Sequence, residues 1–130
     1  MEGGVNEGGR GPSIWDTFSH VEGNIFENAT AEVACDHFHR YKEDILLVKE
    51  LGANAYRFSI SWSRVLPTGS IEGGISEKGL AFYEALCQEV LANGIEPIAT
   101  LYHWDLPEAL EQQGGWLQRG TVDAFAAYAS

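Results

Sequence analysis

Two strand-like segments with a helical segment between them constrain the fold of this chain more than any other feature. Residues 55–62 alternate apolar and polar side chains, residues 95–104 form a second strand-like run, and residues 76–93 carry a helical apolar stripe between them. Strands that are separated by a helix of this length pair in parallel through a right-handed crossover. The pattern therefore predicts an α/β fold.

The predicted sheet is too small to be complete. A sheet of two parallel strands is not a stable unit, and parallel sheets are covered on both faces. We therefore expect the chain to be a slice of a larger α/β protein, cut at both ends. We also expect it to fold poorly alone, because open strand edges and apolar stripes would face water.

Local signals predict the remaining elements. Apolar side chains recur every three or four residues over residues 36–51, which predicts a helix ending at Gly52. Asp105 is expected to cap a short helix with Pro107 near its first turn, and Thr121 is expected to cap a last helix.

Residues 1–34 carry glycine-rich turn signals and no helical period, so they predict a loop. This loop contains several large apolar side chains and is therefore expected to pack against the rest of the protein: Ile14, Trp15, Phe18 and Phe26.

Charge and composition exclude some classes of partner. The 130 residues include 8 basic and 19 acidic side chains, a net charge of −11, so binding to nucleic acid or to anionic lipid is not expected. No apolar run is long enough for a membrane span, and residues 1–11 lack the apolar core of a signal peptide, which slightly favours a cytoplasmic location. Cys35 and Cys87 do not form a C-x-x-C motif and are expected to be buried thiols.

The carboxyl ends of the two strands are the expected place for a functional site, as in other α/β folds. Arg57 stands among serines on one face of the first strand, which indicates either a structural ion pair or an arginine that fixes an acidic group inside a barrel. His103 and Trp104 end the second strand. This pair suits a sugar pocket, because histidine can hydrogen-bond a hydroxyl and an indole offers a flat apolar face, although both are also common in protein cores.

Other polar residues are weaker candidates. Asp105 is better explained as a helix cap than as an acid or base, and Glu96 lies at the amino end of its strand. A metal site at Cys35, Asp36, His37 and His39 is not expected, because two histidines two positions apart cannot share a helix face.

Four long motifs, in the right order over almost the whole chain, resemble the family 1 glycoside hydrolases, the β-glucosidases and their relatives. They are Glu7-Gly-Gly-Arg-Gly-Pro-Ser-Ile-Trp-Asp-Thr-Phe18, Asp36-His-Phe-His-Arg-Tyr-Lys-Glu-Asp44, Tyr56-Arg-Phe-Ser-Ile-Ser-Trp-Ser-Arg64 and Thr100-Leu-Tyr-His-Trp-Asp-Leu-Pro107. The resemblance implies a (β/α)8 TIM barrel that hydrolyses β-glycosidic bonds in carbohydrate metabolism with retention. This chemistry uses two carboxylates about 5–5.5 Å apart.

The resemblance also implies which part of the barrel this is. Residues 1–130 resemble an N-terminal fragment of a single barrel domain, roughly the second and third βα units with the preceding long loop. Met1 stands at the x position of the family's Gln-x-Glu-Gly motif, so the sugar-binding glutamine and the first strand are missing. The Asn-Glu-Pro and Glu-Asn-Gly motifs that carry the two catalytic glutamates are also absent. The chain is therefore expected to be inactive alone and to contain no catalytic residue.

By resemblance, His103 and Trp104 match substrate-binding residues, and Arg57 matches the arginine that supports the nucleophile. Trp62, Arg64 and Trp116 match structural positions. No metal or organic cofactor is implied, and the expected partners are a β-glucoside or related substrate and the remaining part of the barrel. Two alternatives stay open: a carbohydrate-binding remnant without hydrolysis, and a non-enzymatic fragment that complements a barrel piece. The glycone and the aglycone are not specified by these residues.

Overall fold

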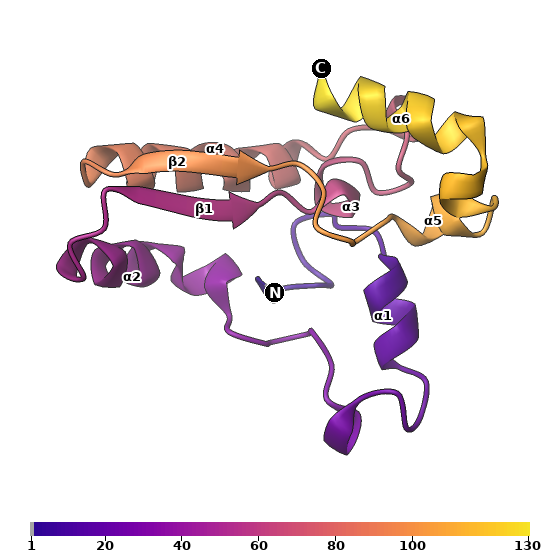
Figure 1. Cartoon of the computed structure of the whole chain (residues 1–130), viewed down its shortest axis with the longest axis horizontal. Helices are drawn as coiled ribbons and strands as arrows, with labels where there is room; N and C mark the ends of the chain where they lie inside the picture. The colour runs from indigo at the N-terminus through magenta and orange to yellow at the C-terminus, as the bar shows by residue number, and fades with distance from the viewer. Residues whose placement is uncertain (1) are drawn as a thin grey trace.

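A computed structural model describes residues 2–130; Met1, and with it the predicted x position of the Gln-x-Glu-Gly motif, lies outside the described residues. The elements in chain order are α1 (Ile14–Ser19), η1 (Phe26–Asn28), α2 (His37–Glu50), β1 (Ala55–Ser59), α3 (Trp62–Val65), η2 (Ile71–Gly73), α4 (Glu77–Ala92), β2 (Glu96–Thr100), α5 (Glu108–Glu111), η3 (Gly115–Leu117) and α6 (Arg119–Ala129). Here α denotes an α-helix and η a turn of 3-10 helix. Figure 1 shows the two strands side by side, with α2 and α4 along them.

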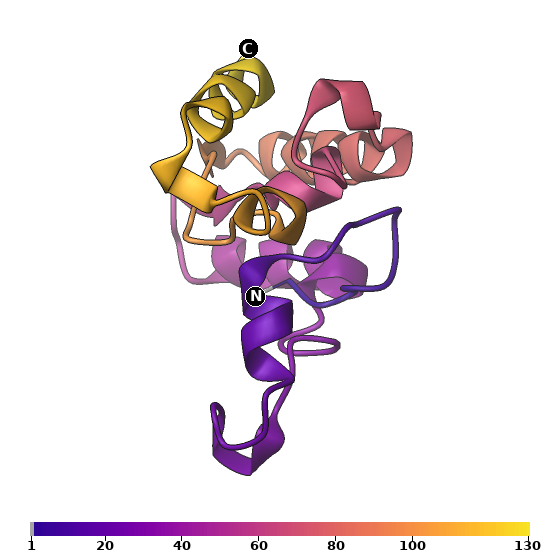
Figure 2. The same ribbon diagram turned by 90° about the vertical axis from the view of Figure 1, so that its right-hand side faces the viewer.

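The two strands pair in parallel, as predicted, with Ala55 opposite Glu96 and Ser59 opposite Thr100. Helices α2 and α4 pack on the same face of this sheet, where Phe58 joins Ile45 in a core cluster with side chains of α4. The opposite face, which carries Arg57, is not covered by a helix of the described residues (Figures 1 and 2). The α/β class is therefore confirmed for this segment, and one face of the sheet is open.

Both strands are shorter than the sequence predicts. The first ends at Ser59 and the second at Thr100, and the chain after β1 turns into α3. Trp62 was expected to continue the first strand, which is wrong: it begins α3 and is fully buried in a second core cluster with Leu66 and Leu106. The turn is held by Tyr83, whose hydroxyl accepts a hydrogen bond of 2.8 Å from the backbone N–H of Ser61.

Two predicted helix caps are also wrong. Helix α5 begins at Glu108 with Pro107 at its N-cap, and Asp105 instead accepts a hydrogen bond from the backbone N–H of His103. Helix α6 begins at Arg119, so Thr121 lies within it, where its hydroxyl donates to the carbonyl of Gly115. In both places the polar side chain makes a hydrogen bond to a backbone group outside the helix, and it does not accept one from the free N–H groups at the start of the helix.

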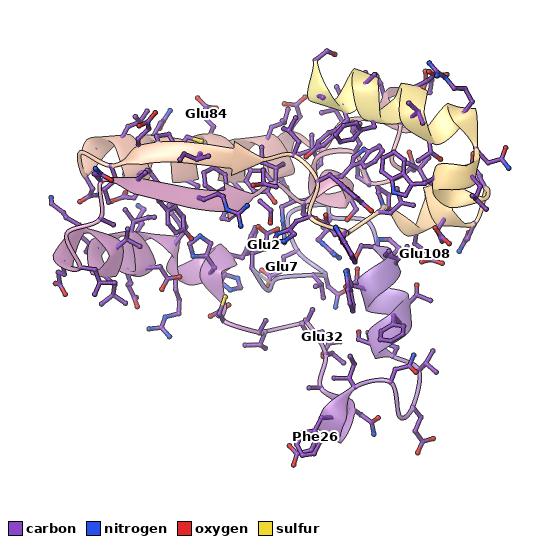
Figure 3. All side chains as sticks on the ribbon, viewed as in Figure 1. Glu2, Glu7, Phe26, Glu32, Glu84 and Glu108 are labelled. Atoms are coloured by element: carbon purple, nitrogen blue, oxygen red, sulfur yellow. The ribbon has the colours of Figure 1, made fainter. Side chains whose placement is uncertain are left out.

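Arg64 is fully buried and ties the N-terminal segment to the core. Its Nε donates to Glu2 Oε1 at 2.7 Å, and its terminal nitrogens donate to the carbonyls of Gly3, Gly4 and Glu7. Figure 3 shows Glu2 and Glu7 near each other beside the sheet; the Glu2 side chain is mostly buried, whereas that of Glu7 is 54% exposed. The Arg64 side chain therefore has the structural role that was expected of it. Burying its charge would be costly without partners, and the Glu2 carboxylate and the three carbonyls offset that cost.

The loop before α2 packs on the body only in part. It contains the short helix α1, which the sequence did not indicate, and Ile14 at its start packs on the second core cluster. Trp15 and Phe18 are partly exposed, and Phe26 is 85% exposed, so the expectation of packing is wrong for Phe26. Cys35 is exposed as well, contrary to its expected burial, and Cys87 is partly buried. Among residues 2–130, no helix is both long and apolar enough to cross a membrane.

His39 links the start of α2 to the N-terminal segment and makes a testable pH-dependent contact. Its Nδ1 lies 2.6 Å from Asp36 Oδ1 and its Nε2 lies 3.1 Å from Glu7 Oε2. Hydrogen bonds to Asp36 and then to Glu7 raise the pKa of His39 above its usual 6.5. The pKa of His39 is higher in the folded chain than in the unfolded chain. The contact therefore stabilises the folded state fully at pH values below the unfolded pKa, and this stabilisation is lost as the pH rises through the folded pKa.

We therefore expect the imidazole protons of His39 to titrate above pH 6.5 in an NMR experiment, with the amide of Glu7 shifting over the same range. A His39→Gln variant serves as the control and should leave the Glu7 amide insensitive to pH in that window. A midpoint at or below 6.5 would contradict the proposed link.

Candidate active site

An open cavity of about 760 Å³ lies at the carboxyl ends of β1 and β2. Its lining includes Arg57 and Ser59 from β1, Thr100 from the end of β2 and His103 from the loop that follows. Glu2 of the N-terminal segment closes part of the wall. Because the carboxyl ends of parallel strands are where α/β enzymes assemble their sites, this cavity is the candidate active site.

Arg57 faces this cavity without an ionic partner among the described residues. It is exposed in this chain, so neither predicted partner, an ion-pairing carboxylate or an acidic group inside a barrel, is found among the described residues. The reason is geometric: the alternation of β1 places Phe58 among the helices and Arg57 on the open face. A guanidinium in this position can bind a carboxylate through two parallel hydrogen bonds.

His103 lies on a loop whose backbone is strained. Trp104 has a φ of 68°, a left-handed value that is uncommon outside glycine and costs about 1–3 kcal/mol. Asp105 Oδ1 accepts a hydrogen bond of 3.2 Å from the backbone N–H of His103, which closes the loop around Trp104. Burial raises the pKa of Asp105 above its usual value.

The structure brings together two of the three predicted site residues. Arg57 and His103 both line the cavity, whereas Trp104 is 73% exposed and is not among the lining residues. Its indole is therefore on the surface, at the position that follows His103 in the chain. Trp116, expected to be structural, donates a hydrogen bond from its indole N–H to the hydroxyl of Tyr102.

A histidine that sequence analysis considered only as a metal ligand also reaches the cavity. His37 Nδ1 lies 2.6 Å from Asp44 Oδ2, and Nε2 lies 3.4 Å from the Tyr56 hydroxyl. Burial raises the pKa of Tyr56. The signal in the sequence was the seven-residue spacing, which puts His37 and Asp44 on one helix face two turns apart. No group of three metal-ligating side chains is found among residues 2–130.

The carboxylates that line the cavity already have partners. Glu2 accepts hydrogen bonds from Arg64 and from the hydroxyl of Tyr83, whose own pKa is raised well above its usual value by burial and by the Glu2 charge. Asp44 is bonded to His37 and Asp105 to the backbone of His103. The described residues can thus hold hydroxyl groups and an anion, but they do not present two unengaged carboxylates for general acid–base work.

A family model for "Glycosyl hydrolase family 1" matches residues 1–130. The chain belongs to glycosyl hydrolase family 1. It is 55% identical over 128 residues to Beta-glucosidase A of Acetivibrio thermocellus, covering 98% of this chain and 28% of that protein. It is 54% identical to Beta-glucosidase 42 of Arabidopsis thaliana, covering 99% of this chain and 26% of that protein. The chain therefore spans about a quarter of the length of these family 1 relatives.

Solved structures of the family agree with the arrangement of the elements. The crystal structure of the rice Os3BGlu6 β-glucosidase superposes with a TM-score of 0.95 at 52% identity, covering 99% of this chain and 27% of that one. The family 1 β-glucosidase of Thermotoga maritima superposes with a TM-score of 0.94 at 51% identity, covering 98% of this chain and 28% of that one. The two parallel strands and their helices thus match a family 1 TIM barrel over about a quarter of its length.

Proposed function

We propose that this chain forms the second and third βα units, with the preceding long loop, of a (β/α)8 barrel that hydrolyses β-glycosides with retention. The observation that carries the proposal is the cavity at the carboxyl ends of the two strands, where Arg57 and His103 converge. Retaining hydrolysis needs a nucleophilic carboxylate and an acid/base carboxylate. In the proposal both come from parts of the barrel outside residues 1–130.

Each of the three predicted site residues has a defined task in this proposal. His103 donates or accepts a hydrogen bond with a hydroxyl of the sugar in the glycone subsite, and Trp104 flanks the same subsite with its indole. Arg57 holds the nucleophile ionised by donating to it from the open face of β1. A cationic neighbour favours the charged form of a carboxylate, so this contact keeps the nucleophile ready to attack.

Without a second source of carboxylates the chain alone does not catalyse this reaction. We expect the 130-residue chain to hydrolyse an aryl β-glucoside at no more than the buffer rate, because its cavity carboxylates are already bonded to Arg64, His37 and the His103 backbone. The measurement is the rate at which the purified chain releases the aryl group, at substrate concentrations used for family 1 β-glucosidases. Turnover that scales with the concentration of the chain would contradict this expectation.

A grafted barrel tests the function itself. Residues 2–130 replace the matching segment of the Thermotoga maritima β-glucosidase, which is 51% identical over this region. The graft is expected to hydrolyse aryl β-glucosides, and His103→Ala in the graft is expected to lower kcat/KM on the order of 10–100-fold through the loss of a substrate hydrogen bond. A folded graft without activity would argue against the proposal, and it would favour a carbohydrate-binding or barrel-complementing role.

A further inference from the structure

The outermost turn of the projecting loop has an unusual backbone. Glu27 and Asn28 both have left-handed backbone angles, with φ of 55° and 52°, and the N–H of Ala29 donates to the carbonyl of Phe26 at 3.3 Å. Two consecutive left-handed residues inside such a hydrogen bond form a type I′ turn, which normally selects glycine or asparagine. A glutamate in the first of these positions is strained, so the turn is not explained by local preference alone.

The same turn carries the acceptor motif for N-linked glycans. Asn28-Ala29-Thr30 fits the pattern Asn-x-Ser/Thr with x other than proline, and none of the chain's other asparagines has a hydroxyl residue two positions later. Asn28 is exposed, and its Oδ1 accepts a hydrogen bond of 3.2 Å from the backbone N–H of Gly23. Among the described residues no hydrogen bond uses its Nδ2, the atom to which a glycan is attached.

Phe26 is the second, independent observation. It stands two residues before Asn28 and is 85% exposed, and Figure 3 shows it at the far end of the loop, pointing away from the body. An exposed aromatic ring at a loop tip offers an apolar face on which a neighbouring ligand can pack. The C–H face of a pyranose is apolar and packs on aromatic rings, as the same chemistry in sugar pockets shows.

We propose that Asn28 is an N-glycosylation site when the chain enters the secretory pathway, and that the first sugar of its glycan packs on Phe26. In the transfer, Asn28 Nδ2 attacks the anomeric carbon of an oligosaccharide that is linked to a lipid through pyrophosphate. A C–N bond forms, the C–O bond to the pyrophosphate breaks, the lipid pyrophosphate leaves, and an amide proton passes to a base of the transferase. The loop projects from the fold (Figures 1 and 2), so a glycan at its tip does not collide with the sheet or with the cavity.

Occupancy of the site is measured on the full chain, expressed behind a cleavable secretory leader in a eukaryotic cell. We expect one glycan by intact mass, removed by peptide N-glycosidase, which leaves aspartate at position 28. Asn28→Gln and Thr30→Ala should abolish the added mass, whereas Thr30→Ser and the control Asn93→Gln should retain it. Chain that enters the secretory pathway and carries no glycan in either the cell lysate or the medium, or a glycan that persists in Asn28→Gln, would overturn the assignment.

The contact with Phe26 is measured after an endoglycosidase has trimmed the glycan to one sugar. Ring currents should move the N-acetyl methyl protons upfield relative to the same sugar in a Phe26→Leu variant. Phe18→Leu is the matched control and should leave the resonance in place, and circular dichroism shows whether all three chains share one fold. An unchanged resonance in Phe26→Leu would overturn the packing of the sugar on this ring.

Discussion

Replacing Arg64 with methionine is expected to lower the free energy of unfolding of the grafted barrel by about 3–5 kcal/mol. The variant removes a fully buried guanidinium that pairs with Glu2 at 2.7 Å and also donates to three backbone carbonyls. Methionine fills much of the volume but supplies no donor, so the Glu2 carboxylate keeps the Tyr83 hydroxyl but loses its cationic partner, and the Gly3 carbonyl loses the Arg64 donor. Urea unfolding followed by circular dichroism gives the change directly.

A matched control uses the same substitution at the surface. Arg40 pairs with Glu43 on α2, but both side chains are more than half exposed, so Arg40→Met should change the free energy of unfolding by less than about 1 kcal/mol. Equal effects of the two variants would show that the Arg64 contacts contribute no more than a surface pair, and the assigned structural role would then be wrong.

Replacing Arg57 with methionine in the grafted barrel is expected to lower kcat by about 100–1000-fold, the range seen when one stabilising donor is removed from an active site. In the proposed function Arg57 acts on the nucleophile and does not touch the sugar, so KM should change only a few-fold. Steady-state kinetics on an aryl β-glucoside separate the two constants. Arg57 is exposed and has no ionic partner among the described residues, and circular dichroism checks that the variant graft keeps its fold.

Two further variants define what Arg57 contributes. Arg57→Lys keeps the charge but not the two-pronged geometry, and it should recover only part of the lost kcat. Arg119→Met removes a cation from α6 whose side chain is 81% exposed, and it should leave both constants unchanged. If Arg57→Met changes kcat by no more than the few-fold change expected for KM, the proposed support of the nucleophile is contradicted.

Sequence periodicity predicted the strands and the long helices, because the apolar stripe of each can be read within the element itself. The parallel pairing of β1 with β2 and the long helices α2 and α4 are confirmed, because each depends on an apolar stripe that can be read along the chain. Helix α4 begins where the predicted helix does, and the structure adds that Ser76 caps it by accepting a hydrogen bond from the backbone N–H of Gly79. The helices follow from apolar stripes within each element, and the parallel pairing follows from the order strand, helix, strand.

The features that were predicted wrongly or not at all depend on contacts that spacing along the chain does not specify. The alternation through Trp62 looks like strand, yet the chain turns at Ser61 because the hydroxyl of Tyr83, 22 residues later, accepts its N–H. The exposure of Arg57 depends on what covers the open face of the sheet, which no pattern within β1 can specify. Asp105 had two backbone partners within reach, the helix start and the His103 N–H, and spacing alone did not decide between them.

The buried contact between Glu2 and Arg64 also bears on the order of events during folding. The partners of Glu2 lie far along the chain: Arg64 is 62 positions later and Tyr83 is 81 positions later. The contact therefore closes a long loop, and its formation early in folding has a high entropic cost. At about 5–20 residues per second, a ribosome needs roughly 4–16 s to make the intervening chain. Glu2 therefore spends that time unpaired, and its ion pair is expected to form after the folding transition state. Losing it should accelerate unfolding far more than it slows folding, which makes this contact a determinant of the protein's kinetic lifetime.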